Sequence, residues 1–202
     1  MGKGIKTYRH TFDYSPGSEH IYRVVSYKSN GVSYSYSYSS AVKVNCAPAP
    51  VTGVAITSTE TSLSFKWDIV PSADGYYVHI SNDKGIILKS ATYKSNTTTS
   101  FSVSGLESGK RYSFSITPYK SNGEWRSPAE SKKFECFTNL RAISGLNCTS
   151  LGSSFISVRW NKVENAEGYM VQKKTADGWV SMSYVTVEDD TASIEMLAFS
   201  NV

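Results

Sequence analysis

The amino-acid sequence predicts an all-β protein made of tandem antiparallel β-sandwiches, one copy complete and two copies partial. The first observation is a repeat: the five residues YKSNG occur at 27–31 and again at 119–123, an offset of 92 residues. The second is that apolar and polar residues alternate with period two, which is typical of half-buried strands. The third is that Gly, Pro, Asn and Asp separate these runs, as turns between strands require.

The composition is that of a folded chain. Of the 202 residues, 40% are hydrophobic, 13% aromatic and 19% charged, which is too apolar for a disordered chain. No apolar run approaches the roughly 20 residues of a membrane-spanning helix, so we expect no membrane span. The first six residues lack the apolar segment of a secretory signal. The net charge of +4 comes from scattered Lys and Arg without a basic stripe, and we expect no nucleic-acid partner.

The repeat sets the expected domain boundaries. At the same offset Gly53 matches Gly145, and after a one-residue insertion Trp67 matches Trp160 at an offset of 93. This period has the size of a small independent domain rather than of a solenoid unit. Because the repeat frame does not begin at residue 1, we expect the C-terminal part of a domain at 1–47, a complete domain at 48–139 and the N-terminal part of a domain at 140–202.

The two partial copies need a partner, because half of a sandwich exposes its core face and unpaired strand edges. Two explanations stay open. In one, the chain is a segment of a longer protein, and other domains of that parent chain flank it. In the other, the early strands of the last copy complete the first copy of another chain, so that strand-complementing copies of the chain itself are the partner.

The strands of the complete copy follow from the alternation of apolar and polar residues. Residues 62–67 (SLSFKW) alternate strictly, which places Trp67 in the core with Trp160 as its counterpart. Residues 161–174 could suggest a helix, but the aligned stretch contains Pro71, so we expect a loop followed by a strand. The expected core faces of the next strands are Tyr76, Val78 and Ile80; Phe101 and Val103; and Tyr112, Phe114 and Ile116.

These residues carry a family resemblance. Trp67 and Trp160 are followed by ADGYYV at 73–78 and AEGYMV at 166–171, and then Leu106, Gly109 and Tyr112 stand at three-residue intervals before FSITPY at 114–119. In this pattern the chain resembles the fibronectin type III family in its bacterial form. The resemblance implies an immunoglobulin-like sandwich with a tyrosine corner at Tyr112, a position that His20 takes in the first copy.

Three cysteines, an odd number, leave at least one thiol unpaired in a monomer. The period-two pattern places Cys46, Cys136 and Cys148 on core faces, so we expect buried free thiols, with a disulfide as the alternative. Their spacing is not that of zinc ligands, and we expect no metal and no cofactor.

The sequence shows no motif for catalysis. Its serines lie in no G-x-S-x-G turn, and neither H-E-x-x-H nor a phosphate-binding glycine loop is present. Of the three histidines, His10, His20 and His79, His20 has no second titratable partner nearby in the pattern, and the alternation points His79 to the solvent face. The acidic run at 188–190 lacks the spacing of a calcium loop. We therefore expect no enzyme and no catalytic residue.

One surface feature suggests binding. Residues 33–40 read SYSYSYSS, and in an extended chain Tyr34, Tyr36 and Tyr38 share one side. The corresponding loop of the next copy carries Trp125 and Arg126. Tyrosine and serine together suit adaptable contacts, so these five residues are the candidate contacts for a glycan or a protein surface. The alternative is that the tyrosine side packs on a neighbouring sheet or domain.

The resemblance implies a non-catalytic spacer or adhesion module of a larger bacterial protein, at the cell surface or secreted. The nine-residue linkers at 45–53 and 137–145 are short, and two prolines stiffen the first, which suits a spacer. Two alternatives stay open: a structural or decoration protein of a phage particle, located in the virion, and a carbohydrate-binding accessory module of a polysaccharide-degrading enzyme.

Overall fold

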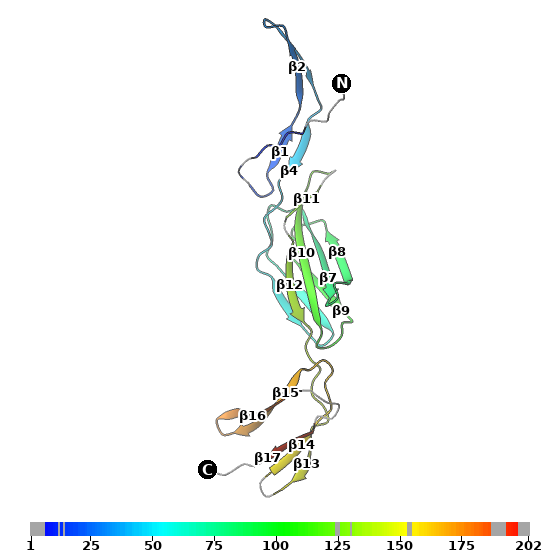
Figure 1. Cartoon of the computed structure of the whole chain (residues 1–202), viewed down its shortest axis with the longest axis vertical. Coiled ribbons are helices and arrows are strands. Elements are labelled where there is room, and N and C mark those ends of the chain that lie inside the picture. Colours follow the sequence, from blue (N-terminus) through cyan, green and yellow to red (C-terminus); the bar gives the residue numbers. More distant parts are fainter. Residues whose placement is uncertain are drawn as a thin grey trace. The chain divides into compact units, whose positions relative to one another are not determined.

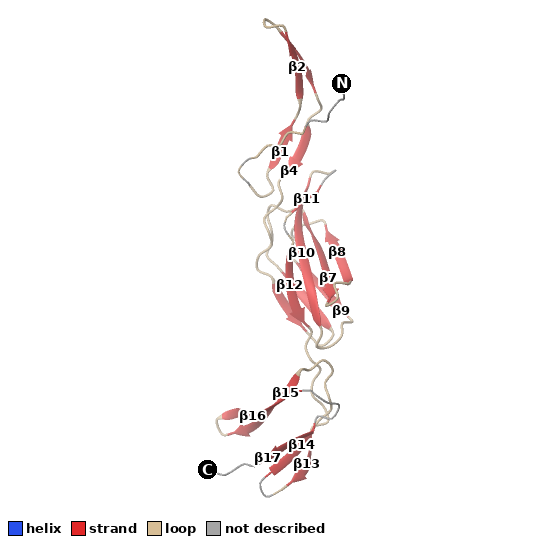
Figure 2. Ribbon diagram, in the orientation of Figure 1, coloured by secondary structure: helices blue, strands red, loops and turns tan. Residues whose placement is uncertain are grey.

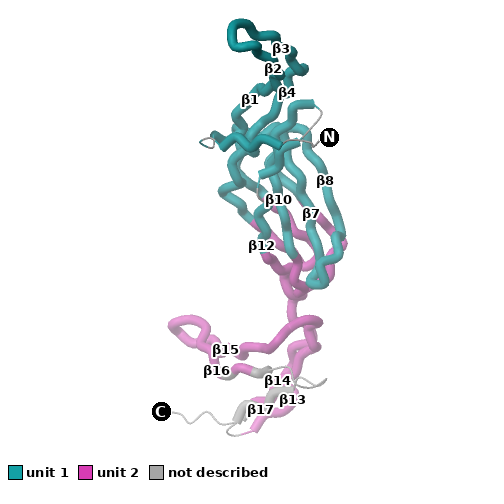
Figure 3. Tube along the Cα trace, turned by 45° about the horizontal axis from the view of Figure 1, so that its top comes forward, with its two compact units in different colours: residues 1–55, 66–101, 113–134 teal, residues 56–65, 102–112, 135–202 magenta. Residues whose placement is uncertain are grey.

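The computed structural model describes residues 7–11, 13, 15–123, 126–129, 131–152, 155–186 and 193–197. All regular elements in these ranges are strands, in agreement with the predicted all-β fold (Figures 1 and 2). Two compact units share the chain, one of residues 1–55, 66–101 and 113–134 and the other of residues 56–65, 102–112 and 135–202 (Figure 3). Across the described ranges, no helix has the length and apolar character needed to cross a membrane.

The middle region, residues 48–139, holds two sheets. One has the order β5-β6-β9, and the other the order β11-β10-β7-β8 with β12 also paired to β10. The period-two prediction is confirmed, because the side chains expected on core faces are buried; among them Leu63, Phe65 and Phe114 are fully buried. The strands are β5 (Ala55–Ser58), β6 (Ser62–Lys66), β7 (Gly75–Asn82), β8 (Ile87–Tyr93), β9 (Ser100–Ser104), β10 (Arg111–Ser121), β11 (Arg126–Pro128) and β12 (Lys132–Phe137).

Aromatic rings form the centre of this core. The ring of Trp67 meets Tyr76 edge-on at 5.5 Å between centroids and lies 6.2 Å from Phe114. Phe101 stacks on Phe114 with 6.0 Å between the ring centroids. Trp67 is 4% exposed, so its predicted core position is confirmed. Aromatic pairs in these geometries add to the free energy that burial of their area supplies.

The N-terminal region, residues 7–47, consists of two antiparallel pairs. Strand β1 (Glu19–Tyr22) pairs with β4 (Val42–Asn45), and β2 (Val25–Ser29) pairs with β3 (Tyr34–Tyr38). Nearly all side chains of these strands are exposed. Described residues 7–18 contribute no strand that could cover them.

The C-terminal region, residues 140–197, has a three-stranded sheet and a hairpin. The sheet has the order β13-β14-β17, and β15 pairs with β16, so the stretch from 161 is a loop followed by a strand, as expected. A small core forms around Trp160, Val163 and Tyr169. The strands are β13 (Asn147–Leu151), β14 (Phe155–Arg159), β15 (Gly168–Thr175), β16 (Gly178–Thr186) and β17 (Ser193–Leu197).

The C-terminal region repeats the local geometry of the middle region. Trp160 meets Tyr169 edge-on at 5.2 Å, as Trp67 meets Tyr76. The hydroxyl oxygen of Tyr169 accepts the N–H of Val163 at 2.7 Å, and that of Tyr76 accepts the N–H of Val70 at 3.0 Å. The three pairs of equivalent residues lie 93 positions apart, so the sequence repeat is matched by equivalent contacts.

All three cysteines are free thiols, but the burial prediction is wrong for one of them and only partly met for another. Cys136 is buried, and this burial, together with the neighbouring charge of Glu135, raises the pKa of its thiol to about 11. Cys46 is half-buried and Cys148 is exposed. Cys148 is exposed because the whole of β13 is exposed, although the residue stands at the alternation position that faces a core in the middle region.

The tyrosine corner that the resemblance implied is present in the middle region. The hydroxyl oxygen of Tyr112 accepts the backbone N–H of Glu107 at 3.0 Å, across a turn where Gly109 has a φ of +68°. Tyr112 is 4% exposed, so its hydroxyl holds the turn from inside the domain.

Replacing Tyr112 by Phe removes this hydroxyl and leaves the half-buried N–H of Glu107 without its acceptor. We expect Tyr112→Phe to lower the free energy of unfolding by about 1–2 kcal/mol, measured by urea denaturation. The matched control is Tyr184→Phe, since Tyr184 is 78% exposed and its change should stay within about 0.5 kcal/mol. Equal effects of the two substitutions would show that the corner hydrogen bond contributes nothing.

Candidate binding surface

The three tyrosines of β3 form an exposed aromatic face on the β2–β3 hairpin. Tyr34, Tyr36 and Tyr38 are 55–59% exposed, and their ring centroids follow one another at 6.0 and 6.3 Å. Tyr27 stands opposite Tyr36 in the register of the hairpin, and its ring lies 6.2 Å from that of Tyr34. We call these four residues the tyrosine face. Its hairpin is labelled in Figure 3.

An arginine lies at one end of the tyrosine face, and a turn closed by side-chain hydrogen bonds lies at the other. The guanidinium carbon of Arg23 lies 4.7 Å from the ring centroid of Tyr38. At the other end, Oδ1 of Asn30 accepts the N–H groups of Val32 and Ser33 at 3.0 and 2.8 Å, which closes the turn. Beside this turn lies a hollow of about 260 Å³, lined by Lys28, Ser29, Asn30, Ser33, Tyr34 and Ser35.

This arrangement is suited to contact rather than to reaction. Tyrosine rings offer apolar faces together with hydroxyls that donate and accept hydrogen bonds, and a neighbouring Arg offers charge. Adjacent rings on one strand present these groups at regular spacing. The tyrosine face therefore combines apolar ring surface with hydroxyl groups along one strand.

Arg126, the other described residue of the predicted set, belongs to a second aromatic cluster. Its Nη1 donates to the hydroxyl of Tyr77 at 2.9 Å, and its guanidinium carbon lies 4.8 Å from the ring centroid of Tyr119. The rings of Tyr77 and Tyr119 are 4.7 Å apart. Arg126 is thus held by its own domain, in contrast to the exposed rings of β3. Trp125 lies outside the described residues.

The prediction from sequence missed several members of both clusters. Tyr27 could not be placed with certainty, because a turn at Asn30-Gly31 would pair it with Tyr34, whereas the turn at Gly31-Val32 pairs it with Tyr36. Tyr77 and Tyr119 could not be placed either, because their meeting with Arg126 depends on the strand order β11-β10-β7. Tyr119 and Arg126 are 92 positions after Tyr27 and Tyr34, so both clusters occupy the same place in the repeat.

The titration of the second cluster follows from its burial and its charges. Burial raises the pKa of Tyr119, the charge of Arg126 acts against this, and Tyr77 and Asp74 add to the increase. The pKa of Arg126 is raised by its hydrogen bond to Tyr77 and by the charges of the tyrosines. At neutral pH Arg126 therefore keeps its positive charge beside the uncharged ring of Tyr119.

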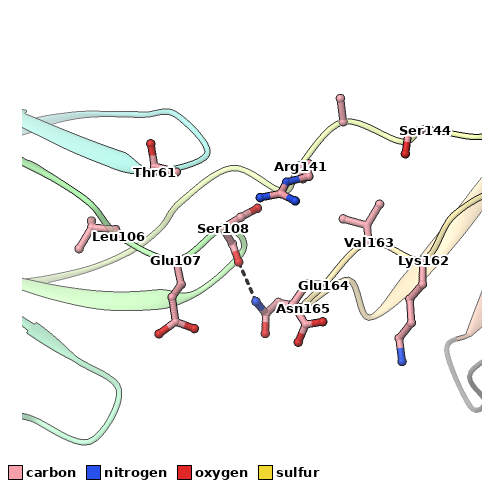
Figure 4. Close-up of a pocket in the computed structure, with 11 residues that line it drawn as sticks. Thr61, Leu106, Glu107, Ser108, Arg141, Ser144, Lys162, Val163, Glu164 and Asn165 are labelled. Carbon is pink, nitrogen blue, oxygen red and sulfur yellow. Dashed lines mark hydrogen bonds between the residues drawn. The ribbon is translucent and has the colours of Figure 1, made fainter.

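The hollow of about 570 Å³ in Figure 4 lies in the second unit. Its hydroxyls come from Thr61, Ser108 and Ser144, and its charged side chains from Glu107, Glu164, Lys162 and Arg141. Among the residues that the structure describes, no group of three His, Cys, Asp or Glu side chains could hold a metal ion.

Comparison with known proteins finds similarity in the middle region. The family model of the fibronectin type III domain matches residues 48–132. A two-domain fibronectin type-III segment from chicken tenascin is 20% identical, covers 74% of this chain and 83% of that chain, and has a TM-score of 0.47. The fn3 domain of the human collagen alpha-1(XX) chain is 16% identical, covers 46% of this chain and 86% of its own, and has a TM-score of 0.39. The curated proteins gave no match.

The described strands form an all-β protein with a fibronectin type III-like sandwich in its middle region, and residues 48–132 of this region match the family model.

The carboxylate of Asp74 connects the start of β7 to the end of β10. Burial alone raises its pKa, but hydrogen bonds from Lys120 Nζ at 2.7 Å and the N–H of Ser121 at 2.9 Å, with the charge of Lys120, outweigh burial and leave the pKa below its usual value of 3.8. Its folded-state pKa is thus lower than its unfolded-state pKa. The stability it contributes is present above about pH 4 and is lost as the pH falls through the folded-state pKa.

We expect Asp74→Asn to reduce the loss of stability between pH 5 and pH 2, because the variant has no carboxylate to protonate at this position. The effect is modest, since the side chain is 40% exposed and solvent screens the ion pair. Urea denaturation at several pH values measures it, with Asp83→Asn, at an exposed turn, as the control. A variant whose acid profile parallels that of the wild type would contradict the role assigned to Asp74.

Proposed function

We propose that the chain is a non-catalytic extracellular spacer and adhesion module of a bacterial surface or secreted protein, built from consecutive copies of the fibronectin type III domain. The tyrosine face on the first copy is its adhesive surface. The single observation that carries this proposal is that four aromatic side chains remain more than half exposed on one hairpin, in contact with one another.

The exposure of the tyrosine face supports a binding role. Tyr119, which takes the place of Tyr27 in the repeat, is only 3% exposed and donates its hydroxyl proton to the carbonyl of Tyr93 at 3.0 Å. Tyr27 is 70% exposed. In the middle region this position is covered by Tyr77 of β7 and Tyr93 of β8. Exposed aromatic groups that lie together, rather than singly, are typical of interaction sites.

The spacer role is supported by the chemistry of the linkers. Both are nine residues long, and the first contains Pro48 and Pro50, which restrict the backbone to extended conformations. Pro48 is itself fully buried, so the linker packs on the domain that it precedes. Short, packed linkers suit a protein that holds a binding surface at a distance from its attachment.

The adhesive role is tested by binding of the full chain to a glycan array and to immobilised extracellular-matrix proteins. We expect binding in one of the two arms, and an affinity at least tenfold lower for Tyr34→Ala/Tyr36→Ala/Tyr38→Ala, since central aromatic residues carry most of the energy of an interface. A second triple variant with Thr at the three positions keeps a high strand propensity, so that loss of the hairpin is not mistaken for loss of the surface.

The matched controls are Ser37→Ala, on the opposite side of β3, and Tyr184→Ala, an exposed tyrosine of β16. Both should bind like the wild type. Unchanged binding of the triple variants would remove the tyrosine face as the site. Binding confined to the glycan array would favour the carbohydrate-binding role, and the absence of binding in both arms would leave only the spacer role.

A further inference from the structure

Two glycines at equivalent positions of the repeat have the same backbone conformation and the same hydrogen bond. Gly17 and Gly109, 92 positions apart, have φ values of +73° and +68°. The N–H of Gly17 donates to the carbonyl of Ala47 at 3.0 Å, and that of Gly109 donates to the carbonyl of Asn139 at 3.1 Å. Ala47 and Asn139 are also 92 positions apart, and each stands where one copy passes into the next.

Each of these glycines faces the same turn of the following copy. A Cβ atom on Gly17 would lie 2.7 Å from the carbonyl oxygen of Ser72 and 2.9 Å from its Cβ. A Cβ atom on Gly109 would lie 3.1 Å from the Cβ of Asn165, which is the equivalent of Ser72 at the offset of 93, and 2.5 Å from Cδ2 of Leu140. Both contacts lie within a single compact unit, the first in one unit and the second in the other.

Polar contacts accompany the close approach at the second of these places. Asn165 has a φ of +63° and is the only described residue other than glycine with a positive φ. Its Nδ2 donates to the carbonyl of Ser108 at 2.7 Å, the interaction marked in Figure 4. A residue other than glycine in this conformation costs free energy, and such strain persists where the surrounding contacts require it.

Two other glycines of positive φ, Gly53 and Gly145, also lie close to a side chain, but Asp68 and Asn161 belong to the same copy as the glycine that they approach. Gly31, Gly85, Gly105 and Gly123 also have positive φ values, but a Cβ atom on any of them would meet nothing within 4 Å. These four turns require glycine only for its positive φ. Gly17 and Gly109 are required for two reasons. The backbone there has a positive φ, and a Cβ atom would collide with the copy that lies against them.

We propose that every copy of this repeat carries two complementary docking surfaces for another copy of the same repeat. The tail surface is the corner glycine with the residue before it (Gly17, or Gly109 with Ser108), and the head surface is the turn at Ser72 or Asn165. The partner is therefore the neighbouring copy of the same chain, and the contact holds consecutive copies in one orientation. This inference rests on the spacer part of the proposed function and is independent of the tyrosine face.

Backbone ¹⁵N relaxation of the full chain tests the second junction. When the copies are docked, strands of the middle region and strands β13 to β15 report one common rotational correlation time. In Gly109→Ala the added methyl group displaces Asn165 and Leu140, and we expect two different correlation times. Gly105→Ala is the matched control, because it places the same strained alanine four residues away with nothing to touch.

Asn165→Asp tests the junction from the other side and leaves Gly109 intact. It replaces the donated hydrogen bond to Ser108 by two oxygen atoms that repel each other, so it should separate the two correlation times as Gly109→Ala does. The first junction is tested in the same way with Gly17→Ala against Gly31→Ala. Independent tumbling in the wild-type chain, or equal behaviour of each variant and its control, would overturn the proposal. Because adhesion is measured separately, loss of binding with the junction intact affects only the proposed function.

Discussion

The contact between a tryptophan and a tyrosine on the following strand is the interaction on which the rest of the structure depends. It occurs at Trp67 with Tyr76 and at Trp160 with Tyr169, and in both places the tyrosine hydroxyl accepts a backbone N–H from the intervening loop. The same loop is closed by a second bond, since the N–H of Ala73 donates to the carbonyl of Val70 and that of Ala166 donates to Val163. A buried ring thus fixes a surface turn, and this turn carries Ser72 or Asn165. The position of the docking turn is in this way a consequence of core packing.

Most of the fold could be predicted from the sequence, because burial on one side of a strand leaves a period-two pattern. This pattern identified the core faces around Tyr76, Phe101 and Phe114, and the repeat excluded a helix after Trp160. The error at Cys148 shows the limit of the method. Alternation tells which face of a strand a residue occupies, but whether a second sheet covers that face is a property of the tertiary structure. In β13 the face stays exposed.

The candidate site shows the same division between local and long-range information. The three tyrosines of β3 could be placed on one side because they are neighbours in a single strand. The surroundings of Arg126 could not be derived, since Tyr77 is about 50 residues away in the sequence and reaches it only through the order of three strands. Equivalent positions of the repeat therefore differ in their contacts. The pair Tyr119 and Arg126 packs within its own domain, and the pair Tyr27 and Tyr34 is exposed to solvent.

The strand that passes from the N-terminal region to the linker, β4, connects the two proposed roles, adhesion and spacing. Besides the contact of Gly17 with Ser72, two side chains of the middle region hold the end of β4: Asn122 Nδ2 donates to the carbonyl of Lys43, and the hydroxyl of Ser127 donates to that of Asn45, both at 2.7 Å. Strand β4 pairs with β1, and the chain between these strands forms the β2–β3 hairpin with the tyrosine face. The segment from β1 to β4 thus carries both the tyrosine face and the hydrogen bonds to the middle region. A force on the tyrosine face would therefore act on the hydrogen bonds of β4 before it reached the sandwich core. The contact of Gly17 with Ser72 and the two hydrogen bonds to β4 therefore join the segment that bears the tyrosine face to the middle region at one place.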